Sequence, residues 1–209
     1  MVADAKSVVA RGYDVAAANY LKRFGHSRVR DRWLNEFVAR LTKHARILDL
    51  GCGAGVPVAR QLAECGFDVV GVDGSIHQVE LARSNVTAAE FIHADMTNVD
   101  FVSSSFDGVA AFYSITHVPR EEHATLLLRI VNWLKPGGLF VASLGSRECP
   151  GWTGEWLGTE MFFSHYGAST NEQLVRNAGL NIEHLETVEQ DNEDSRFLWV
   201  IARRSVDLA

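Results

Sequence analysis

Cysteine is scarce in this sequence, and long apolar runs are absent. The 209 residues include three cysteines, Cys52, Cys65 and Cys149, without Cys-x-x-Cys spacing. Scattered cysteines of this kind argue against structural zinc and suggest a reducing compartment, so we expect a cytoplasmic protein without a metal. No stretch approaches the roughly 20 apolar residues of a membrane-spanning helix, and no apolar signal sequence follows Met1. We therefore expect no membrane partner.

Positive charge is also in short supply. The chain has 20 Lys and Arg residues against 26 Asp and Glu residues, a formal net charge of −6. Proteins that bind nucleic acids concentrate basic residues on one surface, so we expect no nucleic-acid partner. A small molecule, uncharged or cationic, fits this charge better than a polyanion. The chain is expected to be a monomer or a homodimer.

Short apolar runs alternate with helical segments over most of the chain. Helices are predicted at 4–22, 28–44, 55–65, 75–86 and 120–134. Strands are predicted at Arg46–Leu50, Asp68–Val72, Glu90–Ala94, Asp107–Phe112 and Gly138–Leu144. Such alternation implies right-handed βαβ units and a parallel sheet. We expect one α/β domain, with a helical cap at 1–44 and a core at 45–144.

The last part of the chain has a different pattern. Residues 145–168 follow neither periodicity and are rich in glycine and aromatic residues, so we expect a long loop that serves as a lid or substrate pocket. Residues 169–209 begin with a predicted helix. Two strand-like runs then follow, Leu180–Glu189 and Arg196–Arg203, joined by a polar turn. This hairpin predicts that one strand runs antiparallel to the others.

A glycine-rich turn follows the first core strand, in Asp49-Leu-Gly-Cys-Gly-Ala-Gly55. The dinucleotide-binding fingerprint needs glycines at relative positions 1, 3 and 6, and here the last of these is Val56. A phosphate-binding loop is excluded because no Gly-Lys-Ser/Thr follows. A carboxylate at Asp49 would repel a pyrophosphate and suits a ligand with an amino group. An NAD-dependent oxidoreductase is therefore the weaker alternative.

Acidic residues also stand at the ends of the next two predicted strands. Asp73 lies in Gly71-Val-Asp-Gly-Ser75, and Asp95 lies in Ala94-Asp-Met96. Open α/β sheets bind ligands at the carboxyl ends of their strands, where a carboxylate can accept from both hydroxyls of a ribose.

Together these motifs resemble the class I methyltransferases that use S-adenosylmethionine (SAM), of the type that acts on small molecules. The resemblance is carried in order by Leu48–Gly55, Gly71–Ser75, Ala94–Met96, Phe106–Val109 and Leu134–Leu139. It implies a Rossmann-like sheet of seven strands, mostly parallel with the last antiparallel, helices on both faces, and SAM as the cofactor.

The resemblance also implies which residues contact SAM. Asp49 would orient the amino group, Asp73 would bind the ribose and Asp95 would accept from the adenine amino group. Since Gly74 stands where family members often have a bulky residue, Ile76 or another residue is expected to cover the adenine. The full expected set is Tyr13, Asp49, Gly51, Cys52, Gly53, Asp73, Gly74, Ser75, Asp95, Met96, Phe112, Tyr113 and Ser114.

Two histidines are candidate general bases, His117 after the fourth core strand and His165 in the aromatic segment, since imidazole titrates in a suitable range. His117 could instead hydrogen-bond the following helix. The expected acceptor pocket consists of Tyr20, Trp152, Trp156, Phe163 and Tyr166. Alternatively, these aromatic residues only anchor the segment, and the tyrosines of the first helix only pack against the sheet.

The sequence thus predicts methyl transfer from SAM to a small-molecule acceptor. Oxygen is the favoured nucleophile, with nitrogen and carbon left open. The alternative from another functional class is a regulatory protein that binds SAM without catalysis.

Overall fold

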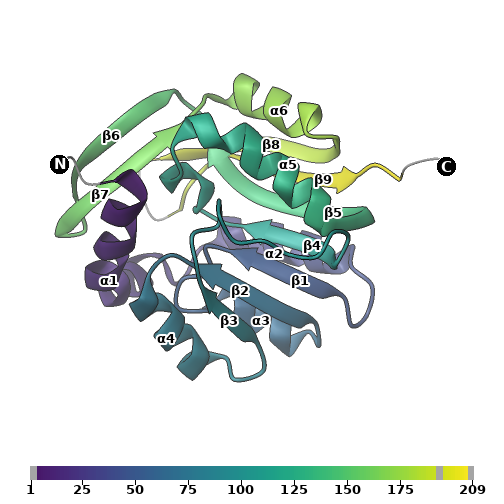
Figure 1. Cartoon of the computed structure of the whole chain (residues 1–209), viewed down its shortest axis with the longest axis horizontal. Helices are drawn as coiled ribbons and strands as arrows, with labels where there is room; N and C mark the ends of the chain where they lie inside the picture. Colours follow the sequence, from purple (N-terminus) through teal and green to yellow (C-terminus); the bar gives the residue numbers. More distant parts are fainter. Residues whose placement is uncertain (1–3, 192–194, 207–209) are drawn as a thin grey trace.

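Helices and strands alternate along the chain in a computed structural model that describes residues 4–191 and 195–206 (Figure 1). The helices are α1 (Ala5–Phe24), α2 (Arg28–Ala39), α3 (Val58–Glu64), α4 (Ile76–Asn85), α5 (His123–Trp133) and α6 (Ala168–Asn177), with short 3-10 turns η1 (Ile115–His117) and η2 (Arg120–Glu122). The strands are β1 (Arg46–Leu50), β2 (Asp68–Asp73), β3 (Glu90–His93), β4 (Phe106–Ala111), β5 (Leu134–Gly145), β6 (Cys149–Trp156), β7 (Thr159–His165), β8 (Leu180–Glu189) and β9 (Arg196–Arg204).

Seven of the strands form one sheet in the order β3-β2-β1-β4-β5-β9-β8. Strands β1 to β5 pair in parallel, whereas β9 runs antiparallel to both β5 and β8. The predicted fold class is therefore confirmed. The strand order reverses between β1 and β4, and open α/β sheets bind their ligands beside such a point.

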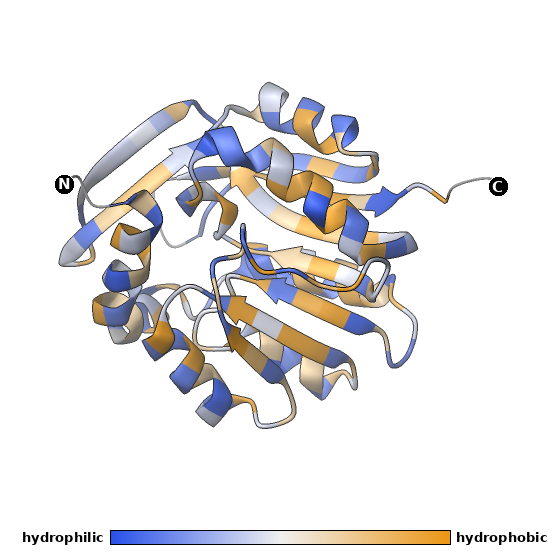
Figure 2. Cartoon of the chain, in the orientation of Figure 1, coloured by the Kyte–Doolittle hydropathy of each residue, from blue (hydrophilic) through white to orange (hydrophobic). Residues whose placement is uncertain are grey.

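Helices cover both faces of this sheet. One face packs against α2, α3 and α4 through Trp33, Phe37, Leu62 and Val79, and the other face packs against α5 and α6. Each fully buried Leu or Phe contributes about 1.5–3 kcal/mol relative to exposure. The central strands are accordingly largely orange in Figure 2, while blue residues lie on the outer helices.

Helix α1 lies apart from these layers, across the edge where β2 ends (Figure 1). Asp14 in its middle accepts hydrogen bonds from the Ser75 hydroxyl (2.5 Å) and from the His77 backbone amide (3.2 Å), at the start of α4. The predicted cap at 1–44 was wrong for α2, because the apolar residues of this helix pack into the sheet face.

The predicted loop at 145–168 was also wrong in form, because β6 and β7 make a separate two-stranded antiparallel sheet. Leu157 and Gly158 join them, with φ angles of 51° and 80°. Positive φ at both positions is typical of a tight two-residue hairpin turn. Pro150 and the glycines of this segment obscured its alternation.

Two further predictions concern the ends of the chain and the membrane. The polar turn predicted between the last two strands, and the termini at 1–3 and 207–209, lie partly or wholly outside the described residues. Within the described ranges, no helix combines the length and the apolar character that crossing a bilayer requires.

Candidate active site

The glycine-rich turn after β1 is packed so tightly that only glycine fits at position 51. Gly51 has a φ of +77°, and a Cβ placed on it would lie 2.2 Å from the Cβ of Ser114. Ser114 is held there because its hydroxyl donates to the carbonyl oxygen of Leu50 at 2.7 Å. At Gly53, by contrast, a Cβ would meet only the far end of Gln78, at 3.9 Å. The backbone of the turn is therefore open towards the side on which α1 lies.

Asp73, at the end of β2, anchors this turn. Its Oδ2 accepts from the Gly53 amide and its Oδ1 accepts from the Ser75 amide, both at 2.9 Å. Burial raises the pKa of the Asp73 carboxyl, while the two amide donors oppose the rise. Each oxygen keeps a lone pair, so the carboxylate can still accept from a ligand's hydroxyls.

Asp49 and Gln78 each bury an oxygen atom that has no hydrogen-bond partner among the described residues. These atoms are Oδ2 of Asp49, whose side chain is 2% exposed, and Oε1 of Gln78. Burial raises the pKa of Asp49 to about 7, and the nearby charge of Asp73 adds to this. An unsatisfied buried acceptor is costly. The pair therefore fits a ligand with ammonium or hydroxyl donors.

A cavity of about 280 Å³ lies between the turn and α1, and we call it the turn cavity. The residues that line it from the sheet side include Gly51, Gly53, Asp73, Gly74, Ser75, Gln78, Asp95, Met96, Phe112, Tyr113, Ser114, His117 and Val118. From α1 come Lys6, Val9, Ala10, Tyr13 and Tyr20. A space of about 50 Å³ continues behind the turn, where Asp49 and the buried Arg30 lie.

Three expected ligand contacts differ from the structure. Ile76 is 42% exposed and does not line the turn cavity, so it does not cover a ligand there. The Cys52 thiol points into the core, since a Cβ on Gly71 would lie 2.9 Å from its sulfur. Burial raises the pKa of this thiol, and Cys52 lines the small space behind the turn and not the turn cavity.

Asp95 is the third difference, because its carboxylate is already saturated. It accepts from the backbone amide and hydroxyl of Thr97, from Asn98, and from Lys6 of α1 at 3.1 Å. Four donors fill the roughly four acceptor positions of a carboxylate. Asp95 therefore lines the cavity with a carboxylate that already accepts from residues of this chain.

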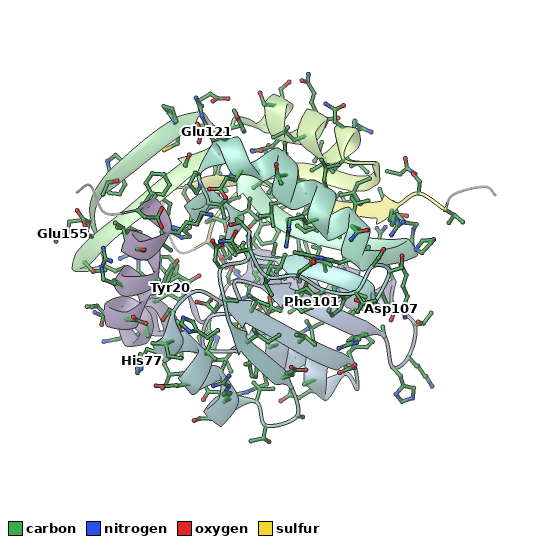
Figure 3. All side chains as sticks on the ribbon, in the orientation of Figure 1. Tyr20, His77, Phe101, Asp107, Glu121 and Glu155 are labelled. Carbon is green, nitrogen blue, oxygen red and sulfur yellow. The ribbon has the colours of Figure 1, made fainter. Side chains whose placement is uncertain are left out.

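A second cavity, of about 420 Å³, lies on the other side of Tyr13, and we call it the aromatic cavity. Its walls include Tyr20, Phe24, Trp156 and Phe163, with Trp156 stacked on Phe24 at 5.9 Å between ring centroids. Figure 3 shows Tyr20 on the side of α1 that faces the sheet. The far end is polar and includes Ser146, Arg147, Glu189, Ser195 and Arg196.

Two of the aromatic residues expected in this pocket lie elsewhere. Trp152 is 45% exposed and packs on Phe163 from outside the cavity. Tyr166 lies under the Arg120 guanidinium, 4.9 Å from its ring centroid, and beside His123. Neither residue lines either cavity.

The two cavities meet at Tyr13, Tyr20, Tyr113 and His117, which line both. Tyr113 has a φ of 56°, an uncommon conformation for a non-glycine residue. Its backbone amide donates to the Ser143 hydroxyl (2.7 Å) and its own hydroxyl donates to Gln190 (2.6 Å). These bonds hold the ring at the junction.

His117, at the same junction, is 8% exposed and has hydrogen bonds at both ring nitrogens. Nδ1 lies 2.8 Å from the carbonyl oxygen of Phe162, and Nε2 lies 2.9 Å from the Tyr13 hydroxyl. Burial lowers the pKa of His117 to about 4, although the bond to Phe162 opposes this. The imidazole is therefore neutral at pH 7.

His165, the second candidate base, also lines the aromatic cavity. Its Nδ1 lies 2.7 Å from the carbonyl oxygen of Arg147. Since a carbonyl can only accept, Nδ1 is the donor in this hydrogen bond. His165 does not line the turn cavity, whereas His117 lines both.

Lys6, Arg30 and Gln78 belong to the site but were not expected from the sequence. Lys6 binds Asp95, 89 positions away, whereas the side chain of Arg30 donates to nearby residues, Phe24, Gly25 and Asp31. Arg30 and Gln78 each carried a local signal, since each lies three residues after a helix-capping serine, Ser27 and Ser75. Within residues 4–191 and 195–206, no group of three or more His, Cys, Asp or Glu side chains could hold a metal ion.

Comparison with known proteins identifies the core of the chain. A family model described as a methyltransferase domain matches residues 47–138. The O-methyltransferase rstn1 of Aspergillus nomiae is 33% identical over 123 residues, which are 54% of each chain. The chain spans only 30% to 54% of the length of the first four curated relatives.

Two solved structures share the fold over almost the whole chain. The 1,6-didemethyltoxoflavin-N1-methyltransferase of Burkholderia thailandensis has a TM-score of 0.76 at 20% identity, covering 95% of this chain and 88% of that one. The magnesium protoporphyrin IX methyltransferase of Synechocystis has a TM-score of 0.76 at 17% identity, covering 98% and 99%. The chain therefore shares the fold of these two methyltransferases, and its residues 47–138, which include the glycine-rich turn, match the methyltransferase domain model.

Proposed function

We propose that this chain binds SAM in the turn cavity and transfers its methyl group to an oxygen atom of a small molecule held in the aromatic cavity. The observation that carries the proposal is the junction, where four residues line both cavities. A donor and an acceptor bound on its two sides would meet there. Such positioning supplies a large part of the rate enhancement of a two-substrate reaction.

The residues around the turn fit SAM. The unpartnered oxygens of Asp49 and Gln78 would accept from its amino group and from its hydroxyls. Asp73 would accept from the ribose hydroxyls, and the open space at Gly74 leaves room beside the base. When bound, SAM supplies a methyl group on a cationic sulfonium.

His117 favours an oxygen acceptor. Its neutral imidazole is buried at the junction, where it can take the proton that a hydroxyl must lose as its oxygen becomes methylated. The aromatic walls exclude water from the reacting atoms. The O-methyltransferase activity named for the relative from Aspergillus nomiae agrees with this choice of nucleophile.

The open aromatic cavity of about 420 Å³ argues against a protein that only binds SAM, since the β6–β7 hairpin does not fill the space beside the junction. The test is a screen of small phenols, carboxylic acids and amines with methyl-labelled SAM. Label in phenols or carboxylic acids is the expected result. Label only in amines would refute the oxygen acceptor, and no label in any compound would refute methyl transfer.

A further inference from the structure

Tyr13 and His117 form a hydrogen-bonded pair at the junction of the two cavities. The Tyr13 hydroxyl lies 2.9 Å from Nε2 of His117, and the two rings meet edge to face at 5.3 Å between centroids. The Tyr13 ring also packs against Tyr20 and Trp156, at 5.4 and 6.1 Å. The hydroxyl is therefore held in place by the ring contacts with Tyr20 and Trp156 as well as by the histidine.

The direction of this hydrogen bond follows from the other side of the imidazole. Nδ1 of His117 lies 2.8 Å from the Phe162 carbonyl oxygen, which can only accept, so Nδ1 carries the proton. A neutral imidazole has one proton on nitrogen, so Nε2 is an acceptor. The Tyr13 hydroxyl is therefore the donor.

This arrangement places Tyr13 between the acceptor and the base. The acceptor position of Nε2 is taken by the Tyr13 hydroxyl, while Tyr13 itself lines the aromatic cavity. A phenolic oxygen that donates one hydrogen bond can still accept another. A hydroxyl in the aromatic cavity thus reaches the histidine through the Tyr13 oxygen.

We propose that Tyr13 is a second catalytic residue, which relays the proton of the acceptor hydroxyl to His117. The acceptor O–H bond breaks and its proton passes to the Tyr13 oxygen, while the Tyr13 proton passes to Nε2. His117 becomes an imidazolium whose Nδ1 proton stays on nitrogen, hydrogen-bonded to the Phe162 carbonyl oxygen. The acceptor oxygen would form its new bond to the methyl carbon as the bond from that carbon to the donor's sulfur breaks. This relay rests on the proposed function, because it needs a hydroxyl acceptor.

The test compares Tyr13→Phe with the wild type on phenols of different acidity, from p-cresol to pentafluorophenol. p-Cresol is neutral at pH 7.5 and must lose its proton, whereas pentafluorophenol enters as the phenolate. We expect kcat to fall roughly 10²-fold for p-cresol, the scale of general acid–base catalysis, and to change little for pentafluorophenol. Tyr166→Phe, which removes a hydroxyl outside both cavities, is the matched control and keeps full turnover.

Equal losses on both phenols would overturn the relay, because they would show that Tyr13 only shapes the cavity. No label in any compound of the acceptor screen with the wild type would refute the proposed function instead. A measurement without ligand then still tests the hydrogen bond between Tyr13 and His117. It is nitrogen-15 NMR of the histidines. We expect an unprotonated Nε2 on His117 whose shift changes in Tyr13→Phe, and a proton on Nε2 in the wild type would overturn the relay.

Discussion

The backbone amide of Gly53 donates to Oδ2 of Asp73 at 2.9 Å, so the carboxylate on β2 holds the glycine-rich turn that follows β1. The strands that carry them are neighbours in parallel register, with Asp49 opposite Gly71. Asp73 therefore shapes the turn, and under the proposed function it would also accept from the ribose hydroxyls.

Replacing Asp73 is expected to weaken SAM binding. Asp73→Ala removes the anchor of Gly53 and the acceptors for the ribose, at a cost of about 1–3 kcal/mol, the value of hydrogen bonds to a charged group. Isothermal titration measures the change. Asp68→Ala, at the other, exposed end of β2, is the control and keeps the wild-type affinity. Unchanged affinity in Asp73→Ala would mean that SAM binds elsewhere.

The Asp49 carboxylate is expected to lower the stability of the ligand-free protein and to strengthen the binding of SAM. Its pKa rises from 3.8 to about 7 on folding, so the folded state binds more protons between these values and loses stability as the pH rises through them. Asp49→Asn should therefore stabilise the ligand-free protein at pH 8 by roughly 1–4 kcal/mol, with no gain near pH 4. Urea denaturation at the two pH values measures this difference.

The same variant should bind SAM more weakly at pH 8, since an amide cannot supply the charge that the ammonium group needs. With the wild type, SAM affinity should fall as the pH drops below 7 and Asp49 becomes protonated. Asp68→Asn is the control for both measurements. A less stable Asp49→Asn protein with unchanged SAM affinity would contradict the assigned role.

His117 should determine turnover without titrating near neutral pH. His117→Ala is expected to lower kcat roughly 10²-fold, while His77→Ala, an exposed histidine on α4, leaves it unchanged. Because the pKa of His117 is lowered to about 4, the imidazole stays unprotonated and able to act as a base down to about that pH. A wild-type pH profile of kcat on the best phenol checks this, and a loss centred near pH 6.5 that His117→Ala abolishes would contradict it.

Lys6 should keep α1 closed over the turn cavity. It donates to Asp95, Thr97 and Glu122, and it links the first turn of the helix to the end of β3 and to η2. Partly exposed ion pairs are weak, about 0–1 kcal/mol each. Lys6→Ala should therefore speed hydrogen–deuterium exchange in the first half of α1 by a few-fold, whereas Lys22→Ala at its other end should not. Identical protection from exchange in both variants would show that Lys6 does not hold α1 over the turn cavity.

The sheet and the turn could be predicted because their signals are local. Asp49, the glycines and Asp73 lie within a few residues of a strand end, and parallel register then brings them together. The β6–β7 hairpin has weaker local signals. Because the segment was predicted as a loop, Phe163 and Tyr166 were both placed in the acceptor pocket. In the structure Phe163 faces the aromatic cavity, whereas Tyr166 packs on Arg120.

Contacts between distant segments could not be predicted from the sequence. Tyr13 was assigned to SAM from its place on the first helix, and its partner His117 lies 104 positions away. Asp95 was assigned to the adenine from the family resemblance, and nothing local shows that Lys6 reaches it. The Tyr13–His117 and Lys6–Asp95 contacts both depend on where α1 packs on the rest of the protein, and tertiary packing determines this position.

Isothermal titration of the ligand-free wild type with SAM and with NAD measures directly whether the turn cavity binds SAM. We expect one SAM per chain and no measurable binding of NAD, because Asp49 and the missing glycine at Val56 disfavour a pyrophosphate. Binding of NAD without binding of SAM would contradict it.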